Sequence, residues 1–590
     1  MMCRLALVLC FFGFFATSQV QQLDEVILNA QRLNSTIKPL SATRVLDSLN
    51  LTITQEVGGL LQQIPSLFVS SQQNFTQDTR IAIRGFGARA TFGIRGIKVL
   101  LDGIPITTPD GQTQMDHIPL SQIGNIEVLR GISSGLYGNA SGGVILLQSA
   151  PIVTETNIAA TLGDFKSQSV VATIGSAQEK NRFRAIAAYH KQEGYRRWSG
   201  YENTLLSLSN ETELTKYNTL KVDYSFFNSP FAHDAGGLTL TQVNENRKQA
   251  REANLNYNAG EAVHQHQLSA RLKTKDWRLY AFYTRRQLDA KLPFTYGGQI
   301  DLGRDYFGVG AQSSGDKNNW LWHYGIESAA QYDARKRFKN NDGEKETKTL
   351  NQNEHFYSLG AYGIAELAHL DWRFRTALRA DVHRITLTDF LGTHSGKTNL
   401  TAVSPSLALH RKINPKLHSY LRWSTGFETP SLNELSANPT GETGFNASLE
   451  PQQASEVELG ISFYNKKFEL STTLFYTKTK NEILPFELET FPGQNFYANV
   501  GITTRKGIEL EGNWQFATYS RFTFSFSRGR YQTEDKKELP NIPENQFATS
   551  LQHQLGKTTL ALHARYVGTR FADNENTVQV PNFWLSLIHI

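Results

Sequence analysis

The chain has 590 residues, a formal net charge of +6 and 39% hydrophobic residues. A single hydrophobic core rarely exceeds roughly 300 residues, so a soluble protein of this length needs several domains, yet no Pro/Ser-rich linker or charge run divides the sequence. Aromatic residues make up 11%, and the chain has 45 glycines but only 3 methionines. This composition favours many β-strands joined by turns, with aromatic side chains at a membrane interface.

Residues 1–20 have the pattern of a secretory signal peptide. Arg4 supplies a positive charge, Leu5–Phe15 is a short apolar run, and small residues for cleavage follow. The run is shorter than the ~20 apolar residues that a membrane-spanning helix needs. Cys3 and Cys10 both lie in this segment, so we expect no disulfide and no thiolate metal site in the mature chain. The alternative is a lipoprotein with Cys10 as its lipidated residue.

Residues 36–151, which follow a short extended segment at 21–35, mix helical and strand patterns and are dense in glycine. A short amphipathic helix is predicted within Leu49–Ile64, where Pro65 ends it. Ile97–Leu101 and Ile126–Leu129 are predicted to be brief strands. The segment is therefore expected to form a small α+β domain.

Residues 155–590 repeat segments of about ten residues in which apolar and polar side chains alternate. In Arg521–Ser527 three phenylalanines share one face, and an arginine, a threonine and two serines share the other. In a soluble sandwich the phenylalanine face would enter a core, whereas in a membrane barrel it faces lipid and the polar face lines a wet lumen. After the signal peptide no apolar run is long enough for a membrane helix, which leaves a closed barrel as the structure that satisfies the backbone in lipid.

Several motifs together resemble the TonB-dependent receptor family, and the resemblance covers nearly the whole chain. The motifs are Leu23–Ala30, Ile83–Gly96, Leu101–Ile106, Ile126–Gly131, Leu136–Val144, Glu456–Gly460 and Gly507–Gly512. A further set is similar to a subgroup usually associated with ferric-siderophore or ferric-citrate uptake: Gly236–Leu240, Gln249–Arg251, Phe427–Leu435 and Leu449–Pro451.

The resemblance implies a membrane all-β fold, a 22-stranded transmembrane antiparallel β-barrel at residues 155–590 with the α+β plug of residues 36–151 in its lumen. Residues 155–590 are too few for 22 strands at roughly 20–25 residues for each strand and connection. Leu585–Ile590 do not resemble a closing strand. We therefore expect a C-terminally incomplete barrel that lacks about three strands.

Residues 21–35 are expected to hold the TonB box and a flexible linker. The box consists of an acidic pair followed by β-forming residues, namely Asp24, Glu25, Val26, Ile27, Leu28, Asn29 and Ala30. Such an extended segment can add as a strand to the sheet edge of the periplasmic TonB domain, so that main-chain hydrogen bonds carry a pulling force.

The resemblance also implies a charge cluster between plug and barrel. Glu458 and Glu509 match positions at which family members carry lumen-facing glutamates, and Arg84 and Arg130 match their partners on the plug. Paired charges in a partly wet lumen hold a plug in register and still let it yield, unlike a dry apolar interface. The alternative is four separately solvated charges.

Ligand contacts are expected from the outward loops of the plug and the long loops of the barrel. The candidates are Phe86, Arg89, Arg95, Thr108, Asp110, Gln112, Arg197 and Trp198. Arg89 and Arg95 have the chemistry to bind an anionic ferric chelate, and the alternative is that they pair with barrel carboxylates. Arg197 and Trp198 belong to a basic aromatic cluster that suits a catecholate or an interfacial girdle.

His264 and His266, two apart on a predicted strand, could chelate a metal, but solvated histidines are the simpler interpretation and we expect no metal site. We expect no catalytic residues and no cofactor.

The function implied is TonB-dependent transport of a scarce solute by a multi-pass protein of the bacterial outer membrane, and the solute expected is a ferric siderophore or ferric citrate. The expected partners are TonB with ExbB/ExbD, an iron-chelate ligand and outer-membrane lipid, with no nucleic acid and with a monomeric receptor. The alternatives are uptake of cobalamin or another metal complex, a passive porin or surface-binding barrel, and an outer-membrane enzyme.

Overall fold

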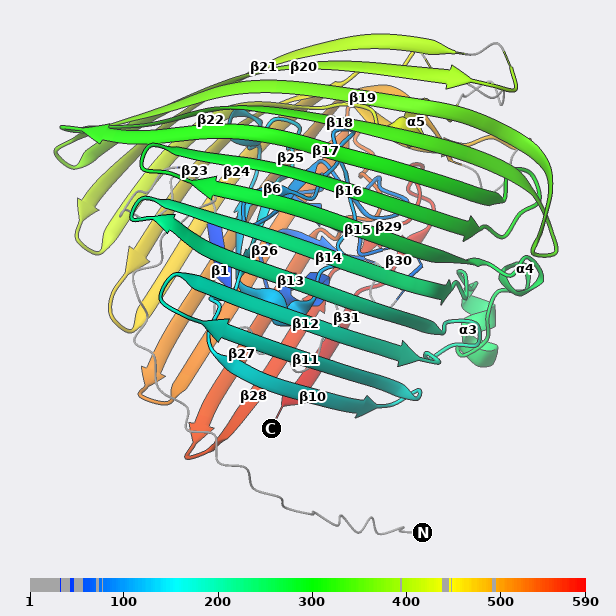
Figure 1. Ribbon diagram of the computed structural model, residues 1–590, viewed down its shortest axis with the longest axis horizontal. Helices are drawn as coiled ribbons and strands as arrows, with labels where there is room; N and C mark the ends of the chain where they lie inside the picture. Colours follow the sequence, from blue (N-terminus) through cyan, green and yellow to red (C-terminus); the bar gives the residue numbers. More distant parts are fainter. Residues whose placement is uncertain are drawn as a thin grey trace.

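The computed structural model describes residues 32, 43–46, 57–70, 74–76, 78–392, 395–437, 445–446, 448–490 and 495–589. A small mixed domain, the plug, lies inside a large curved antiparallel sheet, the barrel (Figure 1). The predicted signal peptide and the predicted TonB box at 24–30 lie outside the described residues. Within 21–35 only Arg32 is described.

The plug has its own sheet and its own apolar core. Its central sheet has the order β1-β8-β9-β5-β6, in which β5 and β9 run parallel. Side chains such as Ile97, Val99, Ile126 and Ile145 form one buried cluster with α1. The elements are β1 (Thr43–Leu46), α1 (Val57–Leu61), β2 (Leu67–Val69), β3 (Ile81–Ile83), β4 (Ile94–Arg95), β5 (Ile97–Leu101), β6 (Ile104–Pro105), β7 (Gln112–Thr113), η1 (Leu120–Gln122), β8 (Ile123–Arg130), α2 (Ser134–Tyr137) and β9 (Gly143–Ser149).

The barrel is a single sheet of 20 antiparallel strands in which neighbours in sequence are neighbours in space, with β10 and β31 at its edges. The strands are β10 (Glu155–Gly163), β11 (Ser167–Ala177), β12 (Asn181–Gln192), β13 (Tyr201–Thr215), β14 (Asn218–His233), β15 (Gly260–Lys273), β16 (Trp277–Lys291), β17 (Gln299–Lys317), β18 (Trp320–Asn341), β19 (Glu344–His369), β20 (Trp372–Asp389), β21 (Gly396–Asn414), β22 (Leu417–Glu428), β23 (Gln452–Tyr464), β24 (Phe468–Glu487), β25 (Asn495–Ala517), β26 (Ser520–Thr533), β27 (Asn545–Leu555), β28 (Thr558–Val567) and β31 (Phe583–His589).

The end of the chain differs from the expectation. Residues 583–589 form β31, which pairs with β28 from Val567–Phe583 to Ala561–His589. The segment reads Phe-Trp-Leu-Ser-Leu-Ile-His and lacks a clean polar alternation, so its strand character depends on the free edge that β28 offers. A 22-stranded barrel that lacks about three strands would have about 19. The sheet has 20 strands, one more than expected.

The two ends of the barrel are built differently. At one end the connections are two or three residues long, as at 318–319, 370–371 and 465–467. The other end carries the longer connections, which hold α3 (Leu240–Asn246), α4 (Glu252–Asn256), α5 (Leu432–Leu435), β29 (Arg570–Phe571) and β30 (Gln579–Val580). Short turns are periplasmic in outer-membrane barrels, and β10 starts at that end directly after the plug.

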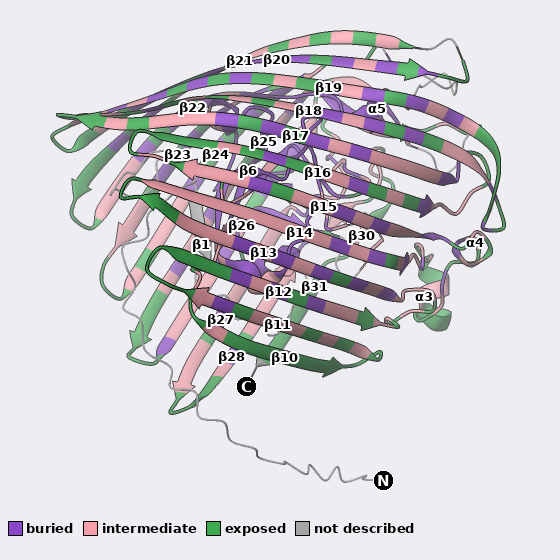
Figure 2. Ribbon diagram, in the orientation of Figure 1, coloured by how far each residue is buried: buried purple, intermediate pink, exposed green. Residues whose placement is uncertain are grey.

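The burial of the barrel strands is inverted relative to a soluble sheet. In β23, Glu456 and Glu458 are 1% and 0% exposed, whereas Val457 and Leu459 are 46% and 43% exposed. Figure 2 shows the same alternation along most of the strands. An apolar outer face with a polar inner face suits a sheet surrounded by lipid. No helix among the described residues is long and apolar enough to cross a membrane.

Exposed tryptophans mark the short-turn end of the barrel. Trp277, Trp320 and Trp372 begin β16, β18 and β20, and Trp514 lies near the end of β25. Amphipathic rings of this kind collect at the level of lipid headgroups. Their position places the periplasmic interface just above the short turns.

We expect Leu459→Arg to destabilise the folded receptor in lipid by ~2–4 kcal/mol, because it puts a charge on the lipid face of β23 near the bilayer midplane. The measurement is the free energy of unfolding in vesicles. Leu370→Arg, in a turn where the side chain is 90% exposed, is the matched control and should change stability by less than about 0.5 kcal/mol. Equal effects of the two substitutions would contradict the assignment of the outer face.

Candidate functional site

Arg84 fixes the plug to the barrel from the turn after β3. Its side chain is fully buried, and its Nη1 lies 2.5 Å from Glu458 Oε2 on β23. Its Nε and Nη2 donate to the two carboxylate oxygens of Glu509 on β25 at 2.8 and 2.9 Å. A bidentate arginine–carboxylate pair fixes both distance and orientation, so Arg84 sets the register between plug and wall.

Arg130, at the end of β8, extends this network. Its Nε lies 3.4 Å from Glu509 Oε2, and its Nη2 donates to Glu511 Oε1 at 2.9 Å. The structure thus brings Arg84, Arg130, Glu458 and Glu509 together as the sequence motifs predicted. We call these four, with the residues described next, the inner cluster.

Sequence reasoning missed four members of the inner cluster. Glu456 lies 3.2 Å from Arg84, and Glu511 binds Arg130. Arg422 lies 3.0 Å from Glu456, and Tyr420 donates its hydroxyl to Glu458 at 2.6 Å. The family resemblance implied that Glu458 and Glu509 face the lumen, and a period of two puts Glu456 and Glu511 on the same faces, so the signal for both was in the sequence.

A second group of charges joins the plug to the long loop after β22. Arg89 lies 2.7 Å from Glu428 and 2.9 Å from Glu434, and Arg95 lies 3.1 Å from Glu434. Glu434 also closes a capping box with Ser431 at the start of α5. We call Arg89, Arg95, Glu428 and Glu434 the outer cluster.

The outer cluster realises the alternative for Arg89 and Arg95, which is pairing with barrel carboxylates. Their side chains are only 5% and 3% exposed, so in this conformation they are not available to a ligand. Burial acts to raise the pKa of Glu434, but the charges of Arg89 and Arg95 outweigh it and lower that pKa to about 2.

The other ligand candidates on the plug are also buried. Phe86 is 1% exposed and lies 4.0 Å beneath the guanidinium of Arg505. Thr108 donates its hydroxyl to Asp110 at 2.6 Å, Asp110 accepts from the backbone of Gln112, and all three are less than 9% exposed. These side chains hold a turn together and face the barrel, which corrects the expectation that they present a ligand surface here.

The remaining two ligand candidates, Trp198 and Arg197, lie in the loop between β12 and β13 and differ in their contacts and exposure. Trp198 stacks on His233 with ring centroids 4.1 Å apart, and its Nε1 donates to Ala259 O at 2.7 Å. It therefore anchors the loop. Arg197 is exposed at the long-loop end, beside the exposed Tyr195. Within the described part of the plug, Phe92 is the one large apolar side chain that is exposed, at 40%.

Arg32 contacts both the plug and the barrel. Its Nη2 lies 2.6 Å from Glu327 on β18. Its guanidinium lies between the rings of Tyr137 on the plug and Tyr362 on β19, at 4.3 and 4.2 Å from their centroids. Arg379 shares the same carboxylate at 3.2 Å. Arg32, two positions after the predicted TonB box, is therefore held between plug and wall.

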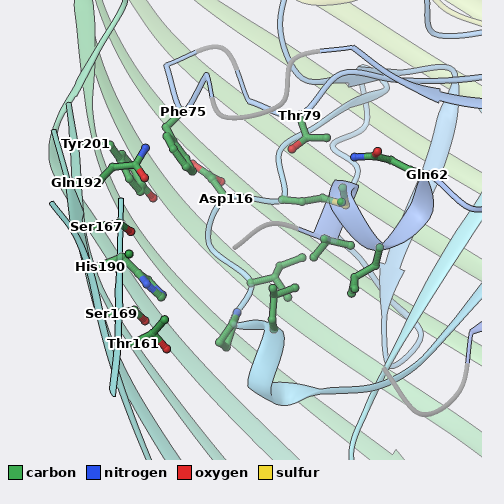
Figure 3. Close-up of a pocket in the computed structure, with 18 of the residues that line it drawn as sticks. Gln62, Phe75, Thr79, Asp116, Thr161, Ser167, Ser169, His190, Gln192 and Tyr201 are labelled. Atoms are coloured by element: carbon green, nitrogen blue, oxygen red, sulfur yellow. The ribbon is translucent and has the colours of Figure 1, made fainter. Parts of the chain in front are cut away.

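A cavity of about 1380 Å³ lies between the plug and the wall at β10–β15, β26–β28 and β31. It runs from Tyr195 in the loop at the long-loop end to Asn157 near the short-turn end. In Figure 3 hydroxyl, amide and imidazole side chains of the wall face Phe75 and Asp116 of the plug. Phe75 stacks on Tyr201 at 4.1 Å, so the cavity wall contacts the plug at its outer end.

The two strand histidines form a pair without further metal ligands. His264 Nε2 lies 2.9 Å from His266 Nε2, and Tyr224 OH lies 2.8 Å from His266 Nδ1. Among the described residues no group of three or more His, Cys, Asp or Glu side chains has the arrangement of a metal site.

Comparisons with known proteins agree with this architecture. The family model for the TonB dependent receptor-like β-barrel matches residues 189–587, and the model for the TonB-dependent receptor plug domain matches residues 42–144. The chain therefore belongs to the TonB-dependent receptors, outer-membrane transport proteins that bind small-molecule ligands and work with TonB. The predicted family and the plugged barrel fold are confirmed.

Individual relatives carry different substrates. The vitamin B12 transporter BtuB of Photobacterium profundum is 23% identical over 591 residues, which cover 95% of this chain and 88% of the relative. The ferric yersiniabactin uptake receptor FyuA from Yersinia pestis has a TM-score of 0.77 at 16% identity, covering 92% of this chain and 89% of its own. The unliganded ferric citrate transporter FecA has a TM-score of 0.78 at 15% identity, covering 93% and 88%. At these identities the solved structures show the shared fold.

We expect Arg84→Gln to loosen the plug strongly, because it removes the guanidinium that holds the buried carboxylates of Glu458 and Glu509 together. Breaking a buried pair costs about 3–5 kcal/mol, which corresponds to a roughly 100-fold or larger rise in hydrogen-exchange rates of amides in β5, β8 and β9 if they exchange by plug opening. Arg182→Gln removes an exposed pair with Glu211 and should leave these rates within about fivefold. Unchanged exchange in Arg84→Gln would show that the inner cluster does not hold the plug.

The outer cluster predicts the pH at which α5 detaches from the plug. Because the pKa of Glu434 is lowered to about 2, the attachment is complete above the ordinary glutamate pKa of ~4.3 and is lost as the pH falls from there through about 2. A spin label at Asn433→Cys should stay immobile at pH 5 and become mobile near pH 2. Adding Glu434→Gln should mobilise it at pH 7.

The control for this experiment is the same label at Glu245→Cys on α3, which is exposed and remote from the plug. Glu434→Gln should leave its spectrum unchanged. An acid transition that is identical with and without Glu434 would assign the detachment to another group.

Proposed function

We propose that this receptor carries a ferric siderophore or ferric citrate across the outer membrane, driven by TonB with ExbB/ExbD. The observation that carries the proposal is a plug held by buried ion pairs beside a cavity lined by both polar and apolar side chains. The plug's ion pairs reach β14–β16, β22, β23, β25 and α5. The cavity borders the wall at β10–β15, β26–β28 and β31, so displacement of the plug would widen a passage that already exists along this part of the wall.

The residues at the mouth of the barrel have the chemistry to bind an anionic, partly aromatic ligand. Arg197 and Lys248 are exposed there, and Lys248 Nζ lies 5.7 Å from the ring of Tyr195. Phe92 adds an apolar surface on the plug. Cations attract a negatively charged chelate, and the rings suit stacking against an aromatic chelator. We propose Arg197, rather than the buried Arg89 and Arg95, as a first contact.

TonB pulling on Asp24–Ala30 would load Arg32 early, because Arg32 follows this segment by two positions and is held by Glu327, Tyr137 and Tyr362. Breaking its pair with Glu327 would pass the force to the plug through Tyr137. In this proposal the receptor acts as a monomer, since plug, wall and cavity all come from one chain.

Cobalamin is the second candidate, and a specific observation favours it. The sequence relative with 95% coverage of this chain is a vitamin B12 transporter. Cobalamin is bulkier and less acidic than ferric citrate, so the two ligands would place different demands on Arg197.

Growth tests distinguish these functions. In a host without its own receptors, the intact protein should restore growth on one of three sources supplied at limiting concentration: ferric citrate, a ferric catecholate or cobalamin. Deletion of Asp24–Ala30 should abolish uptake while binding to energy-depleted cells persists, since in this proposal the segment binds TonB and not the ligand. Uptake that survives the deletion would refute energised transport. Growth that is restored by cobalamin and by neither iron source would show that the solute is cobalamin and not a ferric chelate.

A further inference from the structure

The periplasmic ends of β20–β25 carry a compact group of cations. Arg411 and Lys412 lie near the end of β21, Lys416 lies in the turn before β22, and Lys466 and Lys467 lie in the turn before β24. All five side chains are exposed. We call them the basic rim.

Backbone hydrogen bonds place the turns of the basic rim side by side. Lys412 N donates to Asp371 O at 2.8 Å, which joins the β19–β20 turn to the end of β21. Tyr464 N donates to Lys416 O at 2.8 Å, which joins the two lysine-bearing turns. The cations therefore form one patch along the rim of neighbouring strands.

The protein leaves this charge unneutralised. Among the described residues none of the five cations forms an ion pair within 4.0 Å, and the only exposed carboxylates on the same turns and strand starts are those of Asp371 and Glu469. Some exposed lysines at the long-loop end do bind a carboxylate, namely Lys166, Lys191 and Lys345. Since like charges repel across a small patch, the basic rim is suited to an external anion.

The level of the basic rim relative to the membrane indicates which anion it meets. Arg411 lies 4.9 Å from the centroid of the Trp372 ring, and Trp372 and Trp514 are exposed on the outer face of the barrel at this level. Such tryptophans lie among lipid headgroups, and lysine and arginine stems beside them extend toward the phosphates. The basic rim thus lies at the headgroup level of the periplasmic leaflet.

We propose that the basic rim binds the phosphodiester headgroup of an anionic glycerophospholipid in that leaflet. Several cations within reach of one headgroup form charge-assisted hydrogen bonds to its phosphate oxygens. Clustered lysines and arginines next to a membrane attract anionic lipid in proportion to their number. A lipid bound there contacts the outer side of the wall whose inner side, at β22, β23 and β25, carries the inner cluster.

Native mass spectrometry of the full-length receptor tests this proposal with phosphatidylglycerol and phosphatidylethanolamine as probes. We expect wild-type receptor to retain phosphatidylglycerol at least tenfold more than phosphatidylethanolamine. The combined variant Lys412→Gln, Lys416→Gln, Lys466→Gln and Lys467→Gln should lose most of this preference. Lipid binding is measured without the transported solute. A negative result would therefore refute the lipid site and leave the proposed transport function untouched, and failure of the transport function would leave the lipid site untouched.

The matched control removes the same charge from the long-loop end, by Lys336→Gln, Lys339→Gln, Lys348→Gln and Lys397→Gln. It should keep the wild-type preference. Equal loss in both variants would mean that net charge alone attracts the lipid, and this would overturn the site. Displacement of the lipid by inorganic phosphate, beyond that by chloride at the same ionic strength, would assign the patch to free phosphate. A variant that keeps its lipid but binds the TonB periplasmic domain more weakly would assign it to a protein partner.

Discussion

The position of the plug depends on the buried pairing of Arg84 with Glu458 and Glu509. Two carboxylates on different strands accept from one guanidinium, so a shift of the plug along or around the wall breaks hydrogen bonds in a dry setting. A buried charge that loses its partner is costly, whereas a pair that is fully hydrated when it separates is not. Such an interface is stable while it is closed and dry, and it weakens once water enters. This behaviour suits a plug that must be both sealed and movable.

The plug's apolar core is largely its own. Ile97, Val99, Ile126 and Ile145 pack against other plug residues, and apolar clusters that join plug and wall are small, as at Ile104 with Phe282 and Tyr306. The polar lumen face of the strands explains this division, because a β-strand in lipid presents its apolar side chains outward. The plug can therefore lose its wall contacts without exposing its core.

The sequence predicted the inner cluster better than the ligand surface, and the reason is physical. Arg84, Arg130, Glu458 and Glu509 lie in motifs that resemble those of the family, and the resemblance implied their pairing; a strand's period of two keeps such glutamates on one face of the sheet. The partner of Arg89 is Glu434, 345 residues away, and only the folded barrel brings that loop over the plug. Local pattern likewise predicted the core of β5 but not β31, whose pairing depends on the edge of β28.

The inner and outer clusters are connected through one short segment of the plug. Arg84 lies at its start, with Arg89 and Arg95 within the next eleven residues, and Gly87 between them has a φ of +92°. A Cβ at Gly87 would meet the carbonyl oxygens of Ile81 and Arg95, so the segment is tightly folded. Displacing it from the periplasmic side therefore strains the pairs with Glu458 and Glu509 and those with Glu428 and Glu434 together. Through this segment, force applied at the inner end of the plug reaches the loop that holds α5 at the outer end.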